Sequence, residues 1–491
     1  MVTKLQRCSI VLLAGLLILG LGASAQAFEA LCGPTGVLKY NQEKTFDGYM
    51  LYSPNKSTTT YLLDNEGQIV HTWKSDYFPG RYCYLLENGH LLRGAQILND
   101  KGKIIRPAPV DATWGMLQEI DWDGNVVWEY KMLSDKITAH HAFYRMPNGN
   151  TLLLGFEGVS KDEARKLGRK NIFEGRMGFG KESTDEYWLD FIREVTPAGK
   201  VAWEWHLKDH LGMGRDKVNF NFILPRATGI NYSSYDWSHG NSISYLPDTD
   251  QVLINFRNLS EFMLINHKTG KIEDRWGNDT TWNPEARKPI WVDDGDQIVF
   301  GSHDAHRIAK GLPGAGNYLL LDNGSERPER QRSRIVEIDA KTKKIVWEYS
   351  PKGIGFMTHR QGSVQRLPNG NTFVCSANHG HVFEVTPDKQ VVWDFVNPLF
   401  KDGKAKIFTT DDVDGVSYAH GGSLNMIHRA YKYGKDFPGL KGRDLTPQGY
   451  IAGDDAPVFY KVWKRGLESD GAVGTADDEE MEDDGPTMHT Y

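Results

Sequence analysis

The sequence has few cysteines and lacks the spaced residue pairs that bind metals. Only 4 cysteines occur among 491 residues, and neither a CxxC nor an HExxH motif is present. A structural or catalytic zinc site therefore has little support. The formal net charge of -7 shows no basic excess, so the composition does not indicate a nucleic-acid-binding protein.

The N-terminal segment has the parts of a secretory signal peptide. Lys4 and Arg7 precede an apolar run at residues 10–21, which leads to a small-residue step that ends at Ala27. This order predicts a signal peptide at residues 1–27, cleaved after Ala27, and not a membrane-spanning helix. We therefore expect an exported protein without a membrane anchor, most simply in a bacterial periplasm.

The C-terminal segment is acidic and has almost no large apolar side chains. Residues 468–491 contain nine Asp and Glu residues and no Lys or Arg. Such a segment cannot bury enough apolar surface to offset the entropy of ordering, so we expect a disordered acidic tail. The sequence does not say what this tail does.

Three cysteines remain after the predicted cleavage, namely Cys32, Cys83 and Cys375. An oxidising compartment permits one disulfide and leaves one thiol over. Pairing of Cys32 with Cys83 would hold the mature N-terminus to the first repeat, and we favour it, although the sequence leaves the pairing open.

Six segments share one pattern, in which an acidic or polar start is followed by a turn, a β-branched pair and a tryptophan. They lie at residues 63–73, 119–128, 194–203, 264–276, 337–347 and 384–393. Each predicts a β-hairpin, since two short alternating runs flank a turn that in most copies carries Gly or Asp.

A second pattern of strand, Pro/Asn/Gly turn and strand alternates with the first. It occurs at residues 86–91, 146–152, 246–252, 312–319 and 367–373. Two hairpins per unit give four strands, and four-stranded units repeated around an axis form a β-propeller. The sequence therefore predicts an all-β, six-bladed propeller at residues 28–467.

The spacing between repeats varies because of insertions at consistent places. These lie at about residues 155–190, 206–236, 277–298 and 401–419, and long loops of this kind commonly form functional rims. We expect them on the active-site side of the propeller. Residues 161–173 within the first insertion have helical character.

Histidines recur just before the second pattern in successive units. They occur in the segments 139–142, 238–241, 301–306, 358–363 and 419–423. The innermost strand of each blade faces the central channel, so equivalent positions in different blades converge at one end of the axis. Solvated turn histidines would be scattered instead, and the pattern predicts a site.

The residues around these histidines suit an oxyanion better than a metal ion. Metal-ligating histidines are commonly supported by carboxylates, and in this sequence only Asp304 follows such a histidine, while Arg257 brings positive charge. Guanidinium, amide and imidazole groups match the oxygens of sulfate or phosphate. A neutral imidazole can also attack a transferable sulfuryl or phosphoryl group.

The chain resembles the bacterial arylsulfate sulfotransferases over about residues 45–465. The resemblance rests on the signal peptide, the hairpin repeats, His239-Gly-Asn-Ser with Arg257 on the next strand, and His303-Asp-Ala-His followed by the segment 320–324. It implies a six-bladed propeller that moves a sulfuryl group from a phenolic sulfate ester to an acceptor phenol. Neither a metal nor a nucleotide nor an organic cofactor is implied.

The resemblance also implies roles for individual residues. His303 corresponds to the nucleophilic histidine, which would carry a sulfohistidine intermediate, and His239, Asn241 and Arg257 correspond to groups that bind the sulfuryl oxygens. A further histidine falls on His141 or its neighbour His140, with His141 preferred. Further candidates for substrate binding are His140, His306 and His359.

Two departures from the family pattern affect these expectations. The family commonly has Gln before the nucleophile, whereas this chain has Ser302, which leaves the support of the His303 ring open. Enterobacterial members carry an additional N-terminal β-domain that helps pair subunits, whereas the first repeat of this chain begins soon after residue 27. The oligomeric state is therefore not predicted.

Two other functions are compatible with an exported propeller that contains many tryptophans. A quinone-dependent dehydrogenase would need cofactor-stacking and calcium-binding residues, which the sequence does not reveal. A non-catalytic propeller would bind a partner on its rim. Acceptor-dependent release of nitrophenol from 4-nitrophenyl sulfate distinguishes a transferase from both.

Overall fold

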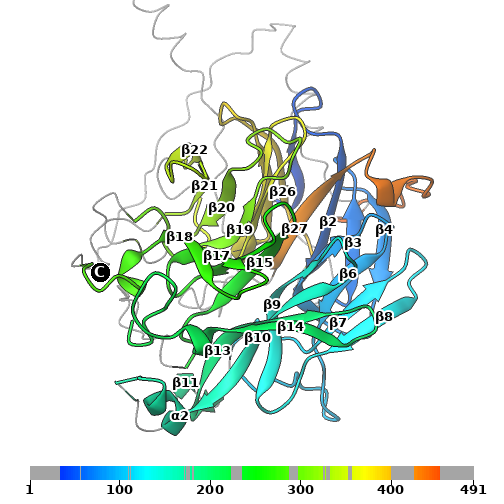
Figure 1. Cartoon of the computed structure of the whole chain (residues 1–491). Coiled ribbons are helices and arrows are strands. Elements are labelled where there is room, and N and C mark those ends of the chain that lie inside the picture. The colour runs from blue at the N-terminus through cyan, green and yellow to red at the C-terminus, as the bar shows by residue number, and fades with distance from the viewer. Residues whose placement is uncertain are drawn as a thin grey trace, which may run out of the picture.

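The computed structural model describes residues 34–453 apart from residues 56, 109, 111, 171, 173–176, 180–181, 223–234, 287–296, 325–326, 328–331, 352–355 and 400–424. The predicted signal peptide, Cys32, His420 and the predicted acidic tail lie outside the described residues. Six antiparallel sheets surround a central axis, which confirms the predicted six-bladed propeller (Figure 1).

The first three blades are four-stranded sheets, in which the strands run in order from the axis outward. They consist of β27 (Ile427–Gly434), β2 (Gly48–Pro54), β3 (Thr59–Leu63) and β4 (Ile69–Lys74); β5 (Pro79–Leu85), β6 (Leu91–Ala95), β7 (Met116–Ile120) and β8 (Val126–Lys131); and β9 (Ile137–Arg145), β10 (Thr151–Ser160), β13 (Glu186–Val195) and β14 (Val201–His206).

The last three blades follow in the same order from the axis outward. They consist of β15 (Gly240–Leu246), β16 (Gln251–Phe256), β17 (Glu261–Asn266) and β18 (Ile272–Gly277); β19 (His303–Arg307), β20 (Tyr318–Asp322), β21 (Arg334–Ile338) and β22 (Ile345–Tyr349); and β23 (Ser363–Arg366), β24 (Thr372–Ser376), β25 (His381–Val385), β26 (Val391–Val396) and β1 (Gly36–Tyr40).

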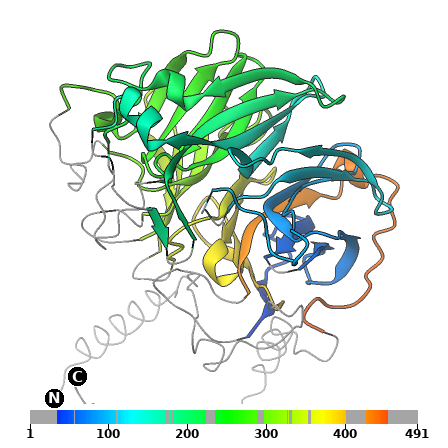
Figure 2. The ribbon, with the colours of Figure 1, turned by 90° about the horizontal axis from the view of Figure 1, so that it is seen from below.

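The two ends of the described chain close the ring together. The C-terminal strand β27 pairs with β2 as the innermost strand of the first blade, while the N-terminal strand β1 pairs with β26 at the outer edge of the sixth. The orange β27 and the blue first blade lie side by side in both views (Figure 1 and Figure 2). Pairing of β27 with β2 covers what would otherwise be a free edge of the first blade and closes the ring.

The predicted hairpins and turns occupy fixed places in the blades. All six tryptophan segments form the outer two strands of a blade, and all five Pro/Asn/Gly turns join the inner two strands. A sixth such turn is not needed, because the inner strand of the first blade comes from the other end of the chain.

The tryptophans link neighbouring blades. Indole N–H groups on outer strands donate to backbone carbonyls in the outer hairpin turn of the next blade: Trp73 to Asp121, Trp128 to Pro197, Trp205 to Gly270, Trp347 to Pro387 and Trp393 to Asn65, at 2.8–3.0 Å. In the third blade this bond comes from Trp205 and not from Trp203, the tryptophan that ends the repeated segment. In the fourth blade the Lys343 ammonium lies 4.5 Å from the Trp276 ring centre instead.

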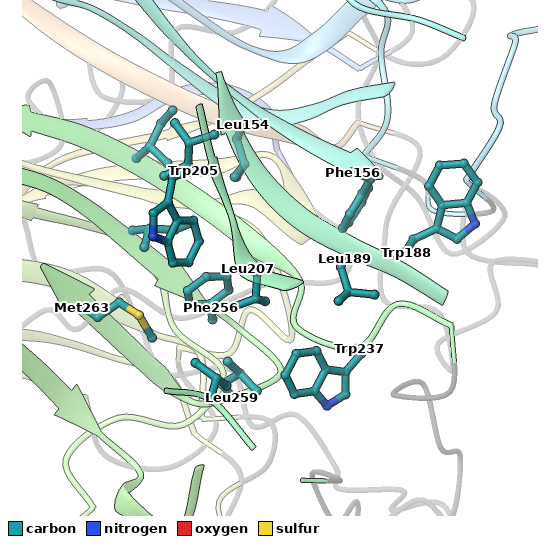
Figure 3. Packing of buried hydrophobic residues seen from close by; sticks show 14 of the residues in the cluster. Leu154, Phe156, Trp188, Leu189, Trp205, Leu207, Trp237, Phe256, Leu259 and Met263 are labelled. Carbon is teal, nitrogen blue, oxygen red and sulfur yellow. The ribbon is translucent and has the colours of Figure 1, made fainter. Parts of the chain in front are cut away.

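Buried apolar side chains form six clusters in the described part of the chain, and each cluster lies between two adjacent blades. Figure 3 shows the cluster between the third and fourth blades, where Phe156 and Leu189 face Trp237 and Phe256. Burial of such side chains contributes about 1.5–3 kcal/mol each, so the blade interfaces hold the ring rigid around its axis.

The first insertion is shorter than predicted because strands extend into it. Strands β10 and β13 pair over ten residues each, from Thr151 to Ser160 against Val195 to Glu186. Between them lie helix α2 (Lys161–Lys166), whose first turn is capped by the Ser160 hydroxyl, and the pair β11 (Met177–Phe179) and β12 (Glu182–Thr184). The helix ends before Gly168 and does not reach residue 173.

The remaining short elements are 3₁₀ turns: η1 (Leu207–His210), η3 (Asp279–Thr281), η4 (Ala377–His379) and η7 (Pro438–Leu440). The described parts of the insertions follow an outermost strand or join β10 to β13. Antiparallel topology places these connections at the end of the axis where the inner strands begin, as predicted.

Cys83 and Cys375 are free, buried thiols. Cys83 packs in the apolar cluster between the first and second blades, and its sulfur lies 3.4 Å from the Ser53 hydroxyl. The favoured pairing of Cys83 with Cys32 is therefore not found, because the Cys83 side chain points into the interface between these blades. Among the described residues no helix is both long and apolar enough to cross a membrane.

Candidate active site

Five inner strands have one strained backbone position within or just before them. Non-glycine residues with positive φ occur in the second to sixth blades at Arg81 (78°), His141 (47°), His239 (53°), Asp304 (55°) and Gln361 (65°). In four of these blades the pairing with the neighbouring strand is also interrupted by a bulge. Bulges re-aim side chains, and strain that recurs at one end of the axis points to a functional site.

Three histidines from different blades lie together at this end. The ring centres of His141 and His239 are 4.6 Å apart, and those of His141 and His428 are 5.9 Å apart. His303 from the fifth blade contributes to the electrostatic environment of His141 and His428. His141, His303 and His428 are at most 2% exposed, so the structure forms a shielded ring of imidazoles.

The His303 ring is held by Asn323, which follows strand β20. The Asn323 amide nitrogen donates to the carbonyls of Thr358 and Gln361 at 2.8 and 3.0 Å, so its oxygen faces His303. This oxygen lies 2.7 Å from His303 Nδ1 and accepts its proton. The Nε2 atom therefore carries the lone pair, which accepts the Gln361 N–H at 3.1 Å.

The site favours neutral imidazoles. Burial lowers the pKa of His303 well below its ordinary value of 6.5, and the nearby Arg257 guanidinium lowers it further. Burial and neighbouring imidazoles lower the pKa of His141 in the same way. Burial together with Arg429 and Arg81 lowers the pKa of His428. The His303 ring is thus neutral and oriented at neutral pH, which is the state that nucleophilic attack requires.

The fourth blade supplies both a histidine and a guanidinium. His239 Nδ1 forms a short contact with the Asp236 carboxylate, which fixes the ring orientation. The backbone N–H of Arg257 donates to the His239 carbonyl at 3.0 Å. The guanidinium of Arg257 donates to Asn258 Oδ1 at 2.9 Å. These bonds hold Arg257 beside His303, where it can neutralise an anion.

Asn241 lies close to the site, but both polar atoms of its side-chain amide form hydrogen bonds within the protein. Its nitrogen donates to the Ser302 carbonyl at 2.7 Å, and its oxygen accepts from the Asn255 amide at 2.8 Å. The Ser302 hydroxyl donates in turn to Asn255 Oδ1. The structure therefore gives Asn241 a positioning role for the backbone immediately before His303.

An ion pair spans the axis next to the histidines. The Arg429 guanidinium on β27 lies 2.9 Å from Asp304 Oδ1 and donates to the Asn241 carbonyl at 2.6 Å. Asp304 also accepts the Val364 N–H at 3.0 Å. These contacts join the first, fourth, fifth and sixth blades, so the pair ties together the blades that carry three of the site histidines.

The other predicted binding residues lie outside the ring of imidazoles. His140 is fully buried and stacks on Phe156, with 3.5 Å between ring centres, although its Nδ1 lies 2.9 Å from His141 Nδ1. His306 is half-buried and its Nδ1 contacts the Asp304 carbonyl. His359 is exposed, and the equivalent strained position in its blade is Gln361.

Sequence reasoning missed His428, Arg81 and the supporting Asn323. Among the described residues neither buried ring nitrogen of His428 has a hydrogen-bond partner, which is costly unless a ligand supplies one. His428 is 2% exposed and lies beside His141. Within the described residues no group of three or more His, Cys, Asp and Glu side chains could hold a metal ion.

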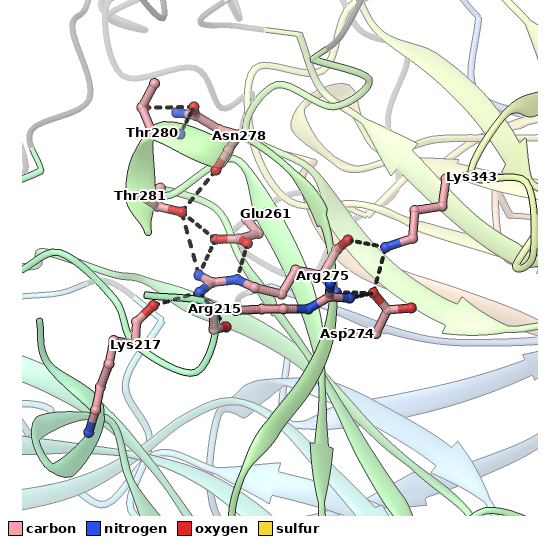
Figure 4. A network of polar contacts seen from close by, with 9 residues as sticks. All are labelled: Arg215, Lys217, Glu261, Asp274, Arg275, Asn278, Thr280, Thr281 and Lys343. Atoms are coloured by element: carbon pink, nitrogen blue, oxygen red, sulfur yellow. Dashed lines mark hydrogen bonds and ion pairs between the residues drawn. The ribbon is translucent and has the colours of Figure 1, made fainter. Parts of the chain in front are cut away.

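A buried polar network anchors two insertions to the outer strands of the fourth blade (Figure 4). Arg275 on β18 pairs with Glu261 at 2.5 and 2.8 Å and donates to the Lys217 carbonyl at 2.5 Å. The Thr281 hydroxyl donates to the same Glu261 carboxylate at 2.8 Å. Lys217 and Thr281 belong to different insertions, so one charged pair fixes both to the fourth blade.

The sequence was compared with models of known protein families and with curated proteins. The family model described as Arylsulfotransferase (ASST) matches residues 35–407. A search of curated proteins found no match.

Solved structures show only a distant likeness. A protein of unknown function from Bacteroides caccae is 12% identical, with a TM-score of 0.41 over 71% of this chain and 93% of that chain. A streptogramin B lyase is 11% identical, with a TM-score of 0.37 over 78% and 87%. The family match covers most of the chain, and the protein belongs to the arylsulfotransferase family.

Proposed function

We propose that this protein transfers a sulfuryl group from a phenolic sulfate ester to an acceptor phenol, with His303 as the nucleophile. The observation that carries the proposal is the bond between His303 Nδ1 and Asn323 Oδ1 at 2.7 Å, which leaves the Nε2 lone pair available. Membership of the arylsulfotransferase family supports the same class of reaction.

In the first half of the reaction, His303 Nε2 attacks the sulfur while the bond from sulfur to the phenolic oxygen breaks. The hydrogen bond from the Gln361 N–H, at 3.1 Å, must then be replaced by the bond to sulfur. The products are a sulfohistidine and a phenolate, which takes up a proton to become the free phenol. In the second half, an acceptor phenol attacks the same sulfur and restores His303.

The surrounding groups suit the charge of the transferred group. Arg257 and His239 lie beside His303 and offer donors to the sulfuryl oxygens, whose charge spreads in a loose transition state, and His141 lies next to them. Shielding from water strengthens these interactions. Asn241 contributes indirectly, because its amide holds the Ser302 carbonyl.

We also propose that the protein is exported to the periplasm after loss of residues 1–27. The motif of the N-terminal segment supports this, and residues 1–27 precede the first described strand. Mass determination of the mature N-terminus after expression in a Gram-negative host tests it, with residue 28 as the expected start.

Assay with 4-nitrophenyl sulfate and phenol tests the proposed reaction. Nitrophenol should be released in an acceptor-dependent manner, and phenyl sulfate should appear in equal amount. Initial rates at varied donor and acceptor should give parallel lines, as in a ping-pong reaction. Absence of phenyl sulfate in the presence of active, folded protein would rule the proposal out.

A further inference from the structure

A buried chain of three polar side chains extends outward from the ring of imidazoles. His141 Nδ1 lies 2.9 Å from His140 Nδ1, and His140 Nε2 lies 3.1 Å from Asp190 Oδ1. All three residues are at most 1% exposed. The last contact has the separation of an ion pair but not the alignment of a hydrogen bond.

The position of Asp190 is determined by the neighbouring blade. The Gly240 N–H donates to both carboxylate oxygens at 2.9 Å, and the Ser238 hydroxyl makes a short hydrogen bond to one of them. A Cβ at Gly240 would lie only 2.5 Å from Asp190 Oδ1, so only glycine fits at this position. The carboxylate is thus fixed between the third and fourth blades.

His140 is the one ionisable side chain that faces Asp190 in the contacts of the described residues. A buried carboxylate requires a positive or hydrogen-bonding partner. On its other sides, His140 meets the uncharged ring of Phe156 and the imidazole of His141. His141 in turn faces His239, His303 and His428.

Only one of the two touching Nδ1 atoms can carry a proton in a hydrogen bond between them. If His141 Nδ1 carries it, then His141 Nε2 is a proton acceptor in the site. If His140 Nδ1 carries it while Nε2 is also protonated, His140 is a cation beside Asp190, and His141 Nε2 is a donor. Movement of one proton between the rings, coupled to gain or loss of one proton at His141 Nε2, switches His141 between these two states.

We propose that Asp190, His140 and His141 form a proton relay that protonates the departing phenolate and deprotonates the acceptor phenol. The inference rests on the proposed function. His141 would touch the phenolic oxygen, whereas His140 and Asp190 act through His141 as positioning residues.

The proton balance closes over one cycle. As the sulfur–oxygen bond breaks, the phenolate oxygen takes the proton from His141 Nε2, and His141 Nδ1 takes the proton from His140 Nδ1. This leaves two neutral rings and the sulfohistidine. The oxygen of the acceptor phenol then bonds to sulfur as the bond between sulfur and His303 Nε2 breaks. The phenol gives its proton to His141 Nε2, and the Nδ1 proton returns to His140.

The dependence on the leaving group tests the relay. Phenol resembles the tyrosine side chain, with a pKa of about 10, and gains from protonation, whereas 4-nitrophenolate is a much weaker base and leaves without it. For His140→Gln and Asp190→Asn, kcat/KM should fall ~10²-fold or more with phenyl sulfate but less than ~10-fold with 4-nitrophenyl sulfate. The matched control is His206→Gln, on the outer strand of the same blade beside Glu157, which should change neither.

Equal losses with both donors would overturn the relay and assign His140 and Asp190 a structural role only. Unchanged rates in both variants would also overturn it. Asp190→Asn disturbs contacts to Gly240, so its thermal unfolding should be compared with that of His140→Gln, which keeps those contacts. Failure of wild-type protein with both donors would instead refute the proposed function.

Discussion

His303 and Asn323 form a hydrogen-bonded pair in which the ring Nδ1 lies 2.7 Å from the amide oxygen. The amide cannot turn over without breaking its bonds to the Thr358 and Gln361 carbonyls. Asn323 therefore sets the tautomer of His303 through Nδ1, while Nε2 on the other side of the ring faces the site. Ser302 therefore does not need to supply this support.

Replacement of Asn323 by Asp should change the pH dependence of donor cleavage. The pKa of wild-type His303 is lowered by burial and by Arg257, so the ring stays neutral as the pH falls below 6.5. A carboxylate at position 323 favours the imidazolium and raises this pKa. Because the imidazolium has no free lone pair, the acid limb of kcat/KM for 4-nitrophenyl sulfate should move to higher pH. An unchanged limb would show that His303 is not the titrating nucleophile.

Replacement of Arg257 by Lys should weaken the enzyme without abolishing it. Lysine keeps the positive charge but loses the planar pair of donors. Loss of one oriented donor typically costs ~10²–10³ in kcat. Steady-state assays with 4-nitrophenyl sulfate measure this effect. An effect on KM alone would mean that Arg257 binds the ground state and the transition state equally.

Replacement of His428 by Phe should lower activity but not stability. The change removes two buried nitrogens that have no partner in the fold, so the melting temperature should stay the same or rise. If these nitrogens contact the substrate, kcat/KM should fall ~10–10³-fold.

The matched control for His428 is His359→Phe, because His359 is exposed and lies outside the ring of imidazoles. Its activity should remain within a few-fold of wild type. Loss of activity in His359→Phe but not in His428→Phe would restore the sequence-based choice of His359 as a binding residue.

Disruption of the Arg429–Asp304 pair should destabilise the propeller. Arg429→Met leaves a buried carboxylate without its cation, which costs about 3–5 kcal/mol of unfolding free energy. The exposed pair Arg165–Asp162 on helix α2 provides the control, where Arg165→Met should cost at most about 1 kcal/mol. Denaturant unfolding measures both, and equal small losses would show that the axial pair does not hold the blades.

The repeats in the sequence were sufficient to predict the fold. Hairpin turns and alternating strands are local features, and their order determines a propeller. The pairing of β27 with β2, which closes the ring, could not be predicted from local patterns, because these strands are far apart in the chain. His428 was missed for the same reason: it lies in the one inner strand without a following Pro/Asn/Gly turn, and the search for a repeated histidine led to His420.

The directions of individual side chains could not be predicted from the pattern. His140 and His141 are adjacent, and the positive φ of His141 breaks the alternation that would assign their faces. Asn241 carries an amide in the expected place, yet that amide bonds the Ser302 carbonyl. Tertiary hydrogen bonds decide such cases, and they join segments about 60 residues apart.

Trapping of the covalent intermediate tests the role of His303 most directly. Wild-type protein should be incubated with 4-nitrophenyl sulfate without acceptor, digested under alkaline conditions and analysed by mass spectrometry, with His303→Ala as the control. We expect one acid-labile sulfuryl group on the peptide that contains His303, lost on addition of phenol and absent from the variant. A sulfuryl group on His141, His239 or His428 instead, or full transfer activity in His303→Ala, would contradict the assignment of His303 as the nucleophile.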